Sequence, residues 1–171
     1  MKGAGLTVRS EPGVHVATLR YFESGGSFAL AAQAATGLQL PGVQQAVESA
    51  GAELTLAWRS PTETLLLSSS AGRLSQLEAA LAHTAGGCLL NLAGGLTLLR
   101  VTGERIAELL CRLGGTACVP GLGEARRSRL ADVPVLALAV RHGETLLLVD
   151  RGYAAHLTGW IRETLLDFAD P

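Results

Sequence analysis

Charged and aromatic side chains are scarce in this sequence. Charged residues make up 17% of the 171 residues and aromatic residues 4%, whereas hydrophobic residues make up 48%. So large an apolar fraction excludes a disordered chain, because disorder requires low hydrophobicity and high charge. The shortage of aromatic rings argues against a surface that stacks bases, flavins or sugars. Fourteen basic and fifteen acidic residues give a net charge of −1, without the basic excess that favours nucleic acid or an anionic membrane.

Cysteine is also rare, and its spacing fits neither a disulfide framework nor a zinc site. Cys88, Cys111 and Cys118 are odd in number and form no CxxC motif, so we expect three reduced thiols. No uninterrupted run of about 18 apolar residues occurs, so no membrane-spanning helix is expected. The opening residues, MKGAGLTVRSEPG, lack the apolar stretch of a secretory signal. We therefore expect a cytoplasmic protein.

The usual motifs of catalysis, metal binding and nucleotide binding are missing as well. The four histidines stand far apart in the sequence, without HxH or HExxH spacing: His15, His83, His142 and His156. The serines at 68–70 are not framed by GxSxG, and helix capping explains them more simply. Neither GxGxxG nor GxxxxGK occurs. The sequence therefore predicts no catalytic, cofactor-binding or metal-binding residue on this chain.

The hydrophobic pattern predicts strands alternating with helices. We expect strands at 14–22, 53–58, 63–68, 88–92, 96–101, 135–140 and 145–149. Segments 53–58 and 63–68 should form a hairpin, as should 135–140 and 145–149, and 88–92 should pair with 96–101. Helical spacing of apolar residues predicts helices at 28–35, 72–84, 106–113 and 152–168. A short helical turn is expected within 43–50, and an irregular segment at 116–129, because glycine and proline are frequent there.

The second half of the sequence echoes the first. LAWR at 56–59 and ETLLL at 63–67 are matched by LAVR at 138–141 and ETLLL at 144–148. Each match spans a predicted hairpin that is followed by a predicted helix. The echo predicts an α+β fold of two βαββα pseudo-repeats, which form adjacent antiparallel sheets with helices packed on them. Chance similarity between leucine-rich strands is the alternative.

The same echo gives the expected domain organisation. We expect a flexible N-terminus at 1–13, a first α+β subdomain at 14–86 and a second at 87–171, with the two subdomains packed as one unit.

Two polar features are candidates for binding. Arg126, Arg127 and Arg129 form the only basic cluster, which is either a solvated loop or a contact for a partner or an anion. Trp58 and Glu63 flank a proline-containing hairpin corner. We expect Trp58 to lie in the core and Glu63 to accept hydrogen bonds from the backbone of the turn, with a binding role for this corner as the alternative.

Five motifs, taken in order, resemble the gamma subunit of heterotetrameric sarcosine oxidase. They are the Leu-Pro after the first helix at 40–41, the Trp-x-x-Pro-x-Glu hairpin at 58–63, the Leu-Asn-Leu-x-Gly-x-x-Thr segment at 90–97, the Leu-Arg-Val-Thr-Gly at 99–103, and the closing helix at 151–160. The likeness runs from about Val14 to Phe168. Asn91 and Ala93 depart from the family pattern, where Asp and Ser are expected, and Ser128 and Gly159 also replace usual choices.

This resemblance implies a fold related to the folate-binding domains of the glycine-cleavage T-protein. It also implies a non-catalytic docking subunit, with alpha, beta and delta subunits as partners. The complex would oxidise sarcosine or a related N-methyl amino acid, with FAD, FMN, NAD and tetrahydrofolate on the partner subunits. A free-standing folate-binding or one-carbon transfer protein is the alternative function, and a homodimer of the isolated chain is a further hypothesis.

Overall fold

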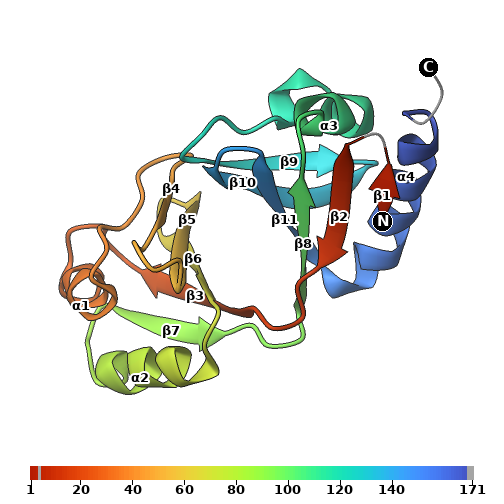
Figure 1. The fold of residues 1–171 in the computed structure, drawn as a ribbon. Coiled ribbons are helices and arrows are strands. Elements are labelled where there is room, and N and C mark those ends of the chain that lie inside the picture. The colour runs from red at the N-terminus through yellow and green to blue at the C-terminus, as the bar shows by residue number, and fades with distance from the viewer. Residues whose placement is uncertain (4, 169–171) are drawn as a thin grey trace. The chain divides into compact units, whose positions relative to one another are not determined.

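Two antiparallel sheets organise the chain in the computed structural model, which describes residues 1–3 and 5–168 (Figure 1). Each sheet belongs to one compact unit. The first unit is Gly13–Ala93, and the second combines Met1–Pro12 with Gly94–Pro171. Within the described ranges, no helix is both long enough and apolar enough to cross a membrane.

The first unit has a five-stranded sheet in the order β4-β5-β6-β3-β7. Its strands are β3 (His15–Tyr21), β4 (Ala46–Glu48), β5 (Leu54–Ser60), β6 (Glu63–Ser68) and β7 (Gly87–Asn91). Two helices, α1 (Ser27–Thr36) and α2 (Ala71–Leu81), pack against one face, where Phe28, Leu56 and Leu77 are buried. The Ser70 hydroxyl accepts a hydrogen bond from the backbone N–H of Arg73 at 3.2 Å, so a serine caps α2 as the sequence predicts.

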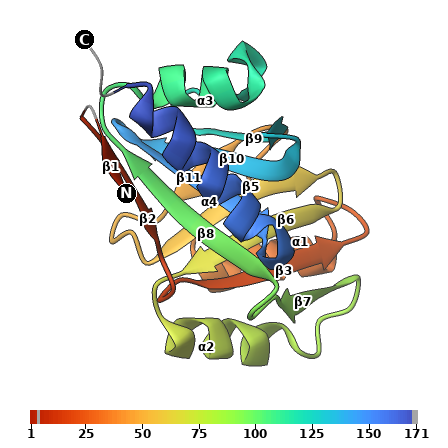
Figure 2. The same cartoon turned by 90° about the vertical axis from the view of Figure 1, so that its right-hand side faces the viewer.

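The second unit has a six-stranded sheet in the order β1-β2-β8-β11-β10-β9. Its strands are β1 (Lys2–Gly3), β2 (Leu6–Ser10), β8 (Leu96–Thr102), β9 (Glu124–Leu130), β10 (Val133–Arg141) and β11 (Glu144–Asp150). Helices α3 (Ile106–Gly114) and α4 (Arg151–Leu166) and the short 3₁₀ helix η1 (Thr116–Cys118) complete it. Figure 2 shows α4 lying across β8 and β11, and its buried Leu157 and Ile161 join the core of this unit.

The predicted α+β fold of two pseudo-repeats is confirmed, and the strand order makes the repeat plain. Strands β4-β5-β6-β3-β7 of the first sheet correspond in order to β9-β10-β11-β8-β2 of the second. The last strand of each series is exchanged between the repeats. β7, which directly precedes β8 in the chain, pairs with β3, whereas β2, which precedes β3, pairs with β8. The unit boundaries therefore differ from the expected subdomain limits, because residues 1–12 supply strands to the second unit and 87–91 supply a strand to the first.

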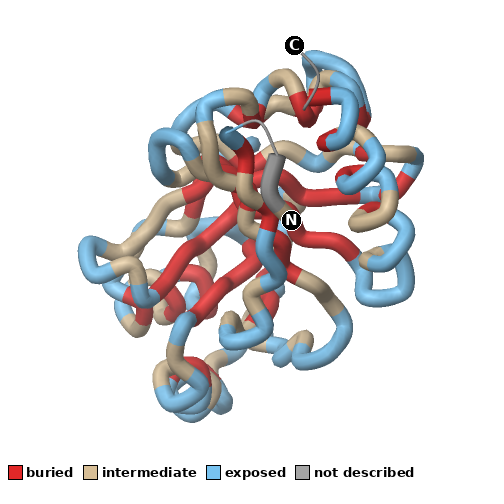
Figure 3. The backbone as a smooth tube through the Cα atoms, turned by 45° about the vertical axis from the view of Figure 1, so that its right-hand side comes forward, coloured by how far each residue is buried: buried red, intermediate tan, exposed pale blue. Residues whose placement is uncertain are grey.

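Three local predictions are wrong. Residues 43–50 were expected to turn as a helix, but Ala46–Glu48 forms strand β4 and pairs with β5. Residues 88–92 and 96–101 do not pair with each other, because β7 and β8 lie in different sheets. The segment 116–129 is not irregular throughout, since β9 begins at Glu124 and pairs with β10. The first and third errors concern strands at a sheet edge in which few residues are buried: Ala46 in β4, and Ala125 and Leu130 in β9. Figure 3 shows buried residues gathered along extended segments of the backbone and exposed residues in the turns between them.

Candidate functional site

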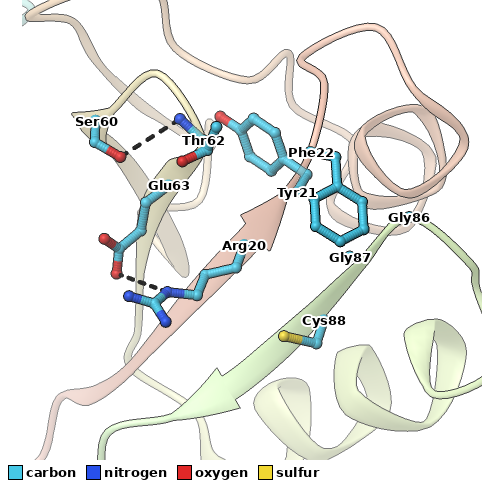
Figure 4. A pocket seen from close by; sticks show the side chains of 9 residues that line it. All are labelled: Arg20, Tyr21, Phe22, Ser60, Thr62, Glu63, Gly86, Gly87 and Cys88. Carbon is cyan, nitrogen blue, oxygen red and sulfur yellow. Dashed lines mark hydrogen bonds and ion pairs between the residues drawn. The ribbon is translucent and has the colours of Figure 1, made fainter.

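A hollow of about 630 Å³ opens in the first unit where β3 ends, β7 begins and the β5–β6 hairpin turns (Figure 4). This volume lies within the range of pockets that hold small ligands or inserted side chains. Nine residues line it: Arg20, Tyr21, Phe22, Ser60, Thr62, Glu63, Gly86, Gly87 and Cys88. The hairpin corner that carries the Trp-x-x-Pro-x-Glu motif therefore contributes directly to the site.

Glu63 is the centre of the polar contacts beside this hollow. Its Oε1 accepts a hydrogen bond from the Thr18 hydroxyl at 2.9 Å and another from Arg59 Nη1 at 2.9 Å. The Nε of Arg20 lies 3.7 Å from the same oxygen (Figure 4). The side chain of Glu63 is only 13% exposed, whereas that of Arg20 is 60% exposed. One nearly buried carboxylate is thus surrounded by two guanidinium groups, and the cluster carries a net positive charge.

Strand register explains why these groups meet. Arg20 on β3 stands directly opposite Glu63 on β6, and Thr18 lies two residues earlier on the same face of β3. The expectation that Glu63 binds the turn backbone is wrong, because Thr18 and Arg59 donate to it from their side chains. The expectation that Trp58 lies in the core is also wrong, because this residue is only partly buried.

Tyr21 and Phe22 are adjacent in the sequence, but their side chains lie in different environments. Tyr21 is buried, and its hydroxyl lies 2.9 Å from the Thr64 hydroxyl. Phe22 is 84% exposed, although its backbone N–H donates to the carbonyl oxygen of Gly86 at 3.1 Å. The ring of Phe22 therefore lies at the surface on a backbone that is held in place (Figure 4). This ring is therefore available for contact with a partner, because aromatic side chains are enriched in protein interfaces.

The lining of the hollow offers groups that can bind a ligand or a partner. Its nine described lining residues include one carboxylate, one guanidinium and one exposed thiol, that of Cys88, and no imidazole. The Glu63 carboxylate already accepts hydrogen bonds from Thr18 and Arg59. Among residues 1–3 and 5–168, no three His, Cys, Asp or Glu side chains come together as metal ligands. The arrangement suits binding of an anionic or apolar group.

The second unit holds a related cluster with the opposite charge balance. Arg100 Nε lies 3.0 Å from Glu11 Oε1, and Arg100 Nη1 lies 2.5 Å from Glu144 Oε1. Partial burial opposes the charged form, but the hydrogen bonds and charges of Glu144 and Glu11 prevail and raise the pKa of Arg100. Arg100 is not the equivalent of Arg20, because Thr102 is the residue opposite Glu144. By strand register Arg100, opposite Leu146, takes the place that Thr18, opposite Leu65, has in the first repeat.

A third ion cluster lies on α3. Glu108 accepts hydrogen bonds from Arg105 at 2.9 and 3.0 Å and from Arg112 at 3.0 Å. Both guanidinium groups also lie over the ring of Phe168, 4.3 and 4.5 Å from its centre. The hydrogen bond from Arg105, aided by the charges of both arginines, lowers the pKa of Glu108. This cluster ties α3 to the residues that follow α4.

The predicted arginine cluster is divided by its strand. Arg126 stands opposite Ala137 on the face of β9 that packs toward the helices, and its Nε donates to Glu124 at 2.8 Å. Arg127 stands opposite Leu136 on the other face. Arg129 donates through Nη2 to the carbonyl oxygen of Asp132. The three guanidinium groups therefore form no single patch, and their contact with a partner or an anion stays a prediction.

Comparison with known proteins decides the family. Residues 23–165 match the family described as sarcosine oxidase, gamma subunit family. The chain belongs to the sarcosine oxidase gamma subunit family. This confirms the resemblance drawn from the five ordered motifs. No curated protein sequence is significantly similar to this gamma-family chain.

Two solved structures show the fold of this gamma-family chain. The heterotetrameric sarcosine oxidase from Corynebacterium sp. U-96, solved in complex with pyrrole 2-carboxylate, contains a chain that superposes with a TM-score of 0.87 at 23% identity. The match covers 100% of this chain and 89% of that one. The glycine cleavage system aminomethyltransferase T from Bartonella henselae gives a TM-score of 0.66 at 14% identity, over 93% of this chain and 46% of that protein. The predicted likeness to the T-protein fold is thereby confirmed.

Sequence reasoning missed most of this site. It singled out Glu63 and the hairpin corner but not Thr18, Arg20, Phe22 or Cys88. The missing information was the pairing of β3 with both β6 and β7, because that pairing brings Arg20 opposite Glu63 on one side and opposite Cys88 on the other. An arginine in a mostly apolar strand was the available signal, since a charge there requires a partner or solvent.

Proposed function

We propose that this chain is the non-catalytic docking subunit of a sarcosine oxidase-like complex that oxidatively demethylates sarcosine or a related N-methyl amino acid. The match of residues 23–165 to the gamma subunit family carries the proposal. The fold shared with a chain of a heterotetrameric sarcosine oxidase supports it. The chemistry of the hollow agrees, because its carboxylate is held by Thr18 and Arg59 and its surface offers contacts.

The partners in this proposal are alpha, beta and delta subunits in a cytoplasmic complex. FAD, FMN, NAD and tetrahydrofolate would bind those partners, and this chain would hold none of them. The scarcity of aromatic side chains supports this assignment, because stacking on aromatic side chains is a common way to hold a planar ring.

Co-expression tests the proposal. The full chain, produced together with the alpha, beta and delta subunits of its own organism, should co-elute with them as one complex that oxidises sarcosine. A complex of the other subunits that forms and turns over sarcosine equally well without this chain would contradict the docking role.

Titration of the isolated chain with tetrahydrofolate tests the alternative function, a free-standing folate-binding or one-carbon transfer protein. A stoichiometric heat of binding at micromolar ligand would favour a free-standing folate-binding protein. Sedimentation of the same sample shows whether the isolated chain is a monomer or a homodimer.

A further inference from the structure

The outer strand β7 is an unprotected sheet edge. Its sequence, Gly-Cys-Leu-Leu-Asn, contains no charged residue, and Cys88 and Leu90 are exposed. The edge strand β9 of the other sheet contrasts with it, because four of its seven residues are charged: Glu124, Arg126, Arg127 and Arg129. Proteins usually place charges on edge strands to prevent pairing with other chains. β9 has this protection and β7 lacks it.

The direction of the backbone groups along β7 defines where pairing would occur. The N–H of Leu92 donates to Val16 and the N–H of Phe22 donates to Gly86, so alternate residues of this ladder exchange hydrogen bonds. By this alternation Cys88 and Leu90 direct their N–H and C=O groups toward β3. Leu89, between them, directs its N–H and C=O groups outward. Leu89 is thus the centre of the open edge.

The side chains beside β7 indicate which charge a strand that pairs with it would carry. Arg20 stands directly opposite Cys88. Its guanidinium group makes no hydrogen bond within residues 1–3 and 5–168, and its closest carboxylate contact is the 3.7 Å approach to Glu63. An added strand would lie about 10 Å from β3, which is two strand spacings and within the combined reach of an arginine and a glutamate side chain. The exposed ring of Phe22 lies at the same end of β7 (Figure 4). The local charge is positive and the flanking surface is apolar.

We propose that β7 is the docking edge of this subunit, where an extended segment of the alpha subunit adds as a strand, with an acidic side chain directed at Arg20 and an apolar one against Phe22. The inference rests on the proposed function, which supplies the partner. The exposed guanidinium group of Arg20 favours an acidic residue in the added strand, because a guanidinium binds a carboxylate through two parallel hydrogen bonds.

Hydrogen exchange on the assembled complex tests this docking mode at the level of single amides. In the isolated chain, the amide of Leu89 should exchange faster than those of Cys88 and Leu90, which bond to β3. In the complex, Leu89 should become protected, while Cys88 and Leu90 change little. Protection of Leu89 that rises with the concentration of the isolated chain would overturn the assignment, because a second copy would then be the occupant.

Substitutions provide an independent measurement of alpha-subunit affinity. Arg20→Glu should weaken association by at least about tenfold, since like charges replace a charge-assisted contact. Arg20→Lys and Phe22→Ser change exposed side chains, are expected to preserve the fold, and should each weaken association several-fold. Arg162→Glu, at an exposed position of α4, is the matched control and should bind as the wild type does, whereas Arg127→Glu on β9 tests the other predicted contact.

The outcomes distinguish this inference from the proposed function. Failure of the wild-type chain to bind the alpha subunit contradicts both. Wild-type binding with unchanged affinity in Arg20→Glu and Phe22→Ser, and with no protection at Leu89, overturns the docking edge alone. Weakening by Arg127→Glu without weakening by Arg20→Glu would move the contact to β9 and equally overturn it.

Discussion

Replacement of Glu63 is the sharpest test of the polar cluster beside the hollow. Its carboxylate is 13% exposed and accepts a hydrogen bond from the Thr18 hydroxyl, which belongs to a residue that is 2% exposed. A hydrogen bond to a charged group contributes about 1.5–3 kcal/mol to stability. The pair with Arg59 contributes less, about 0.2–1 kcal/mol, because that guanidinium is one-third exposed. The contact of Arg20 at 3.7 Å with a 60% exposed side chain adds little.

From these contributions we expect two graded effects. Glu63→Gln keeps the shape and one acceptor but removes the charge, so it should lower the free energy of unfolding by about 1–2 kcal/mol. Glu63→Ala also removes the acceptor and should cost about 2–4 kcal/mol. The loss is limited because the Thr18 hydroxyl retains a long hydrogen bond of 3.4 Å to the Thr64 carbonyl oxygen.

Urea denaturation measures both effects, and Glu124→Gln is the matched control. Glu124 accepts hydrogen bonds from Arg126, two residues away, and from the backbone N–H of Gly121, but its side chain is 36% exposed and the amide oxygen of glutamine can still accept from Gly121. We expect a change within about 0.5 kcal/mol for this control. A double-mutant cycle between Thr18→Val and Glu63→Gln should give a coupling of at least about 0.5 kcal/mol. If Glu63→Ala unfolds at the same urea concentration as the wild type, with the same slope, the reasoning about this cluster is refuted.

Three further predictions concern other parts of the chain. A Cβ added to Gly114 would lie 2.2 Å from a backbone carbonyl oxygen and 2.6 Å from the Cys118 sulfur, so Gly114→Ala should lower the free energy of unfolding, measured with urea, by about 1–3 kcal/mol. Gly159 lies on α4 with open space around it, so Gly159→Ala should raise that free energy by up to about 1 kcal/mol. The carboxyl of Glu108 should titrate in NMR below its ordinary pKa of 4.5; because the folded-state pKa is lowered, its contribution to stability is present above that value and is lost as the pH falls through the folded-state pKa. Cys88 is exposed and Cys118 is buried, so Cys88 should react with a thiol reagent in the native chain and Cys118 only after unfolding; equal rates would contradict the burial.

Local order was predictable from the sequence where a segment carries its own signals. The hairpins β5–β6 and β10–β11 were found because each has a run of apolar residues on both sides of a short polar turn. Helix α3 was found because Ile106, Leu109, Leu110 and Leu113 repeat with helical spacing, and all four are buried. These signals lie within one element, so a single sequence contains them.

Pairing between distant strands was not predictable in the same way. β2 has alternating buried residues, Leu6 and Val8, and this alternation was available in a segment expected to be flexible. Its partner β8 is far away in the sequence, and β7 is the nearer strand to β8. Nothing in the local pattern of β2 or β7 specifies the exchange, because neither short strand carries a signal for the strand with which it pairs. The contacts of Arg20 depend on this exchange and were missed with it.

Divergence between the two repeats is the best guide to function in this family member, because the shared topology accounts for what they have in common. In the first repeat one carboxylate, Glu63, meets two arginines, while in the second one arginine, Arg100, meets two carboxylates. The equivalent outer strands differ as well, since β2 is covered by β1, whereas β7, its counterpart in the first repeat, is the last strand of its sheet. Stability alone requires neither difference, because each unit closes its own core. A positive, apolar and unprotected edge in one repeat only is the pattern expected of a scaffold that has kept one surface for a partner.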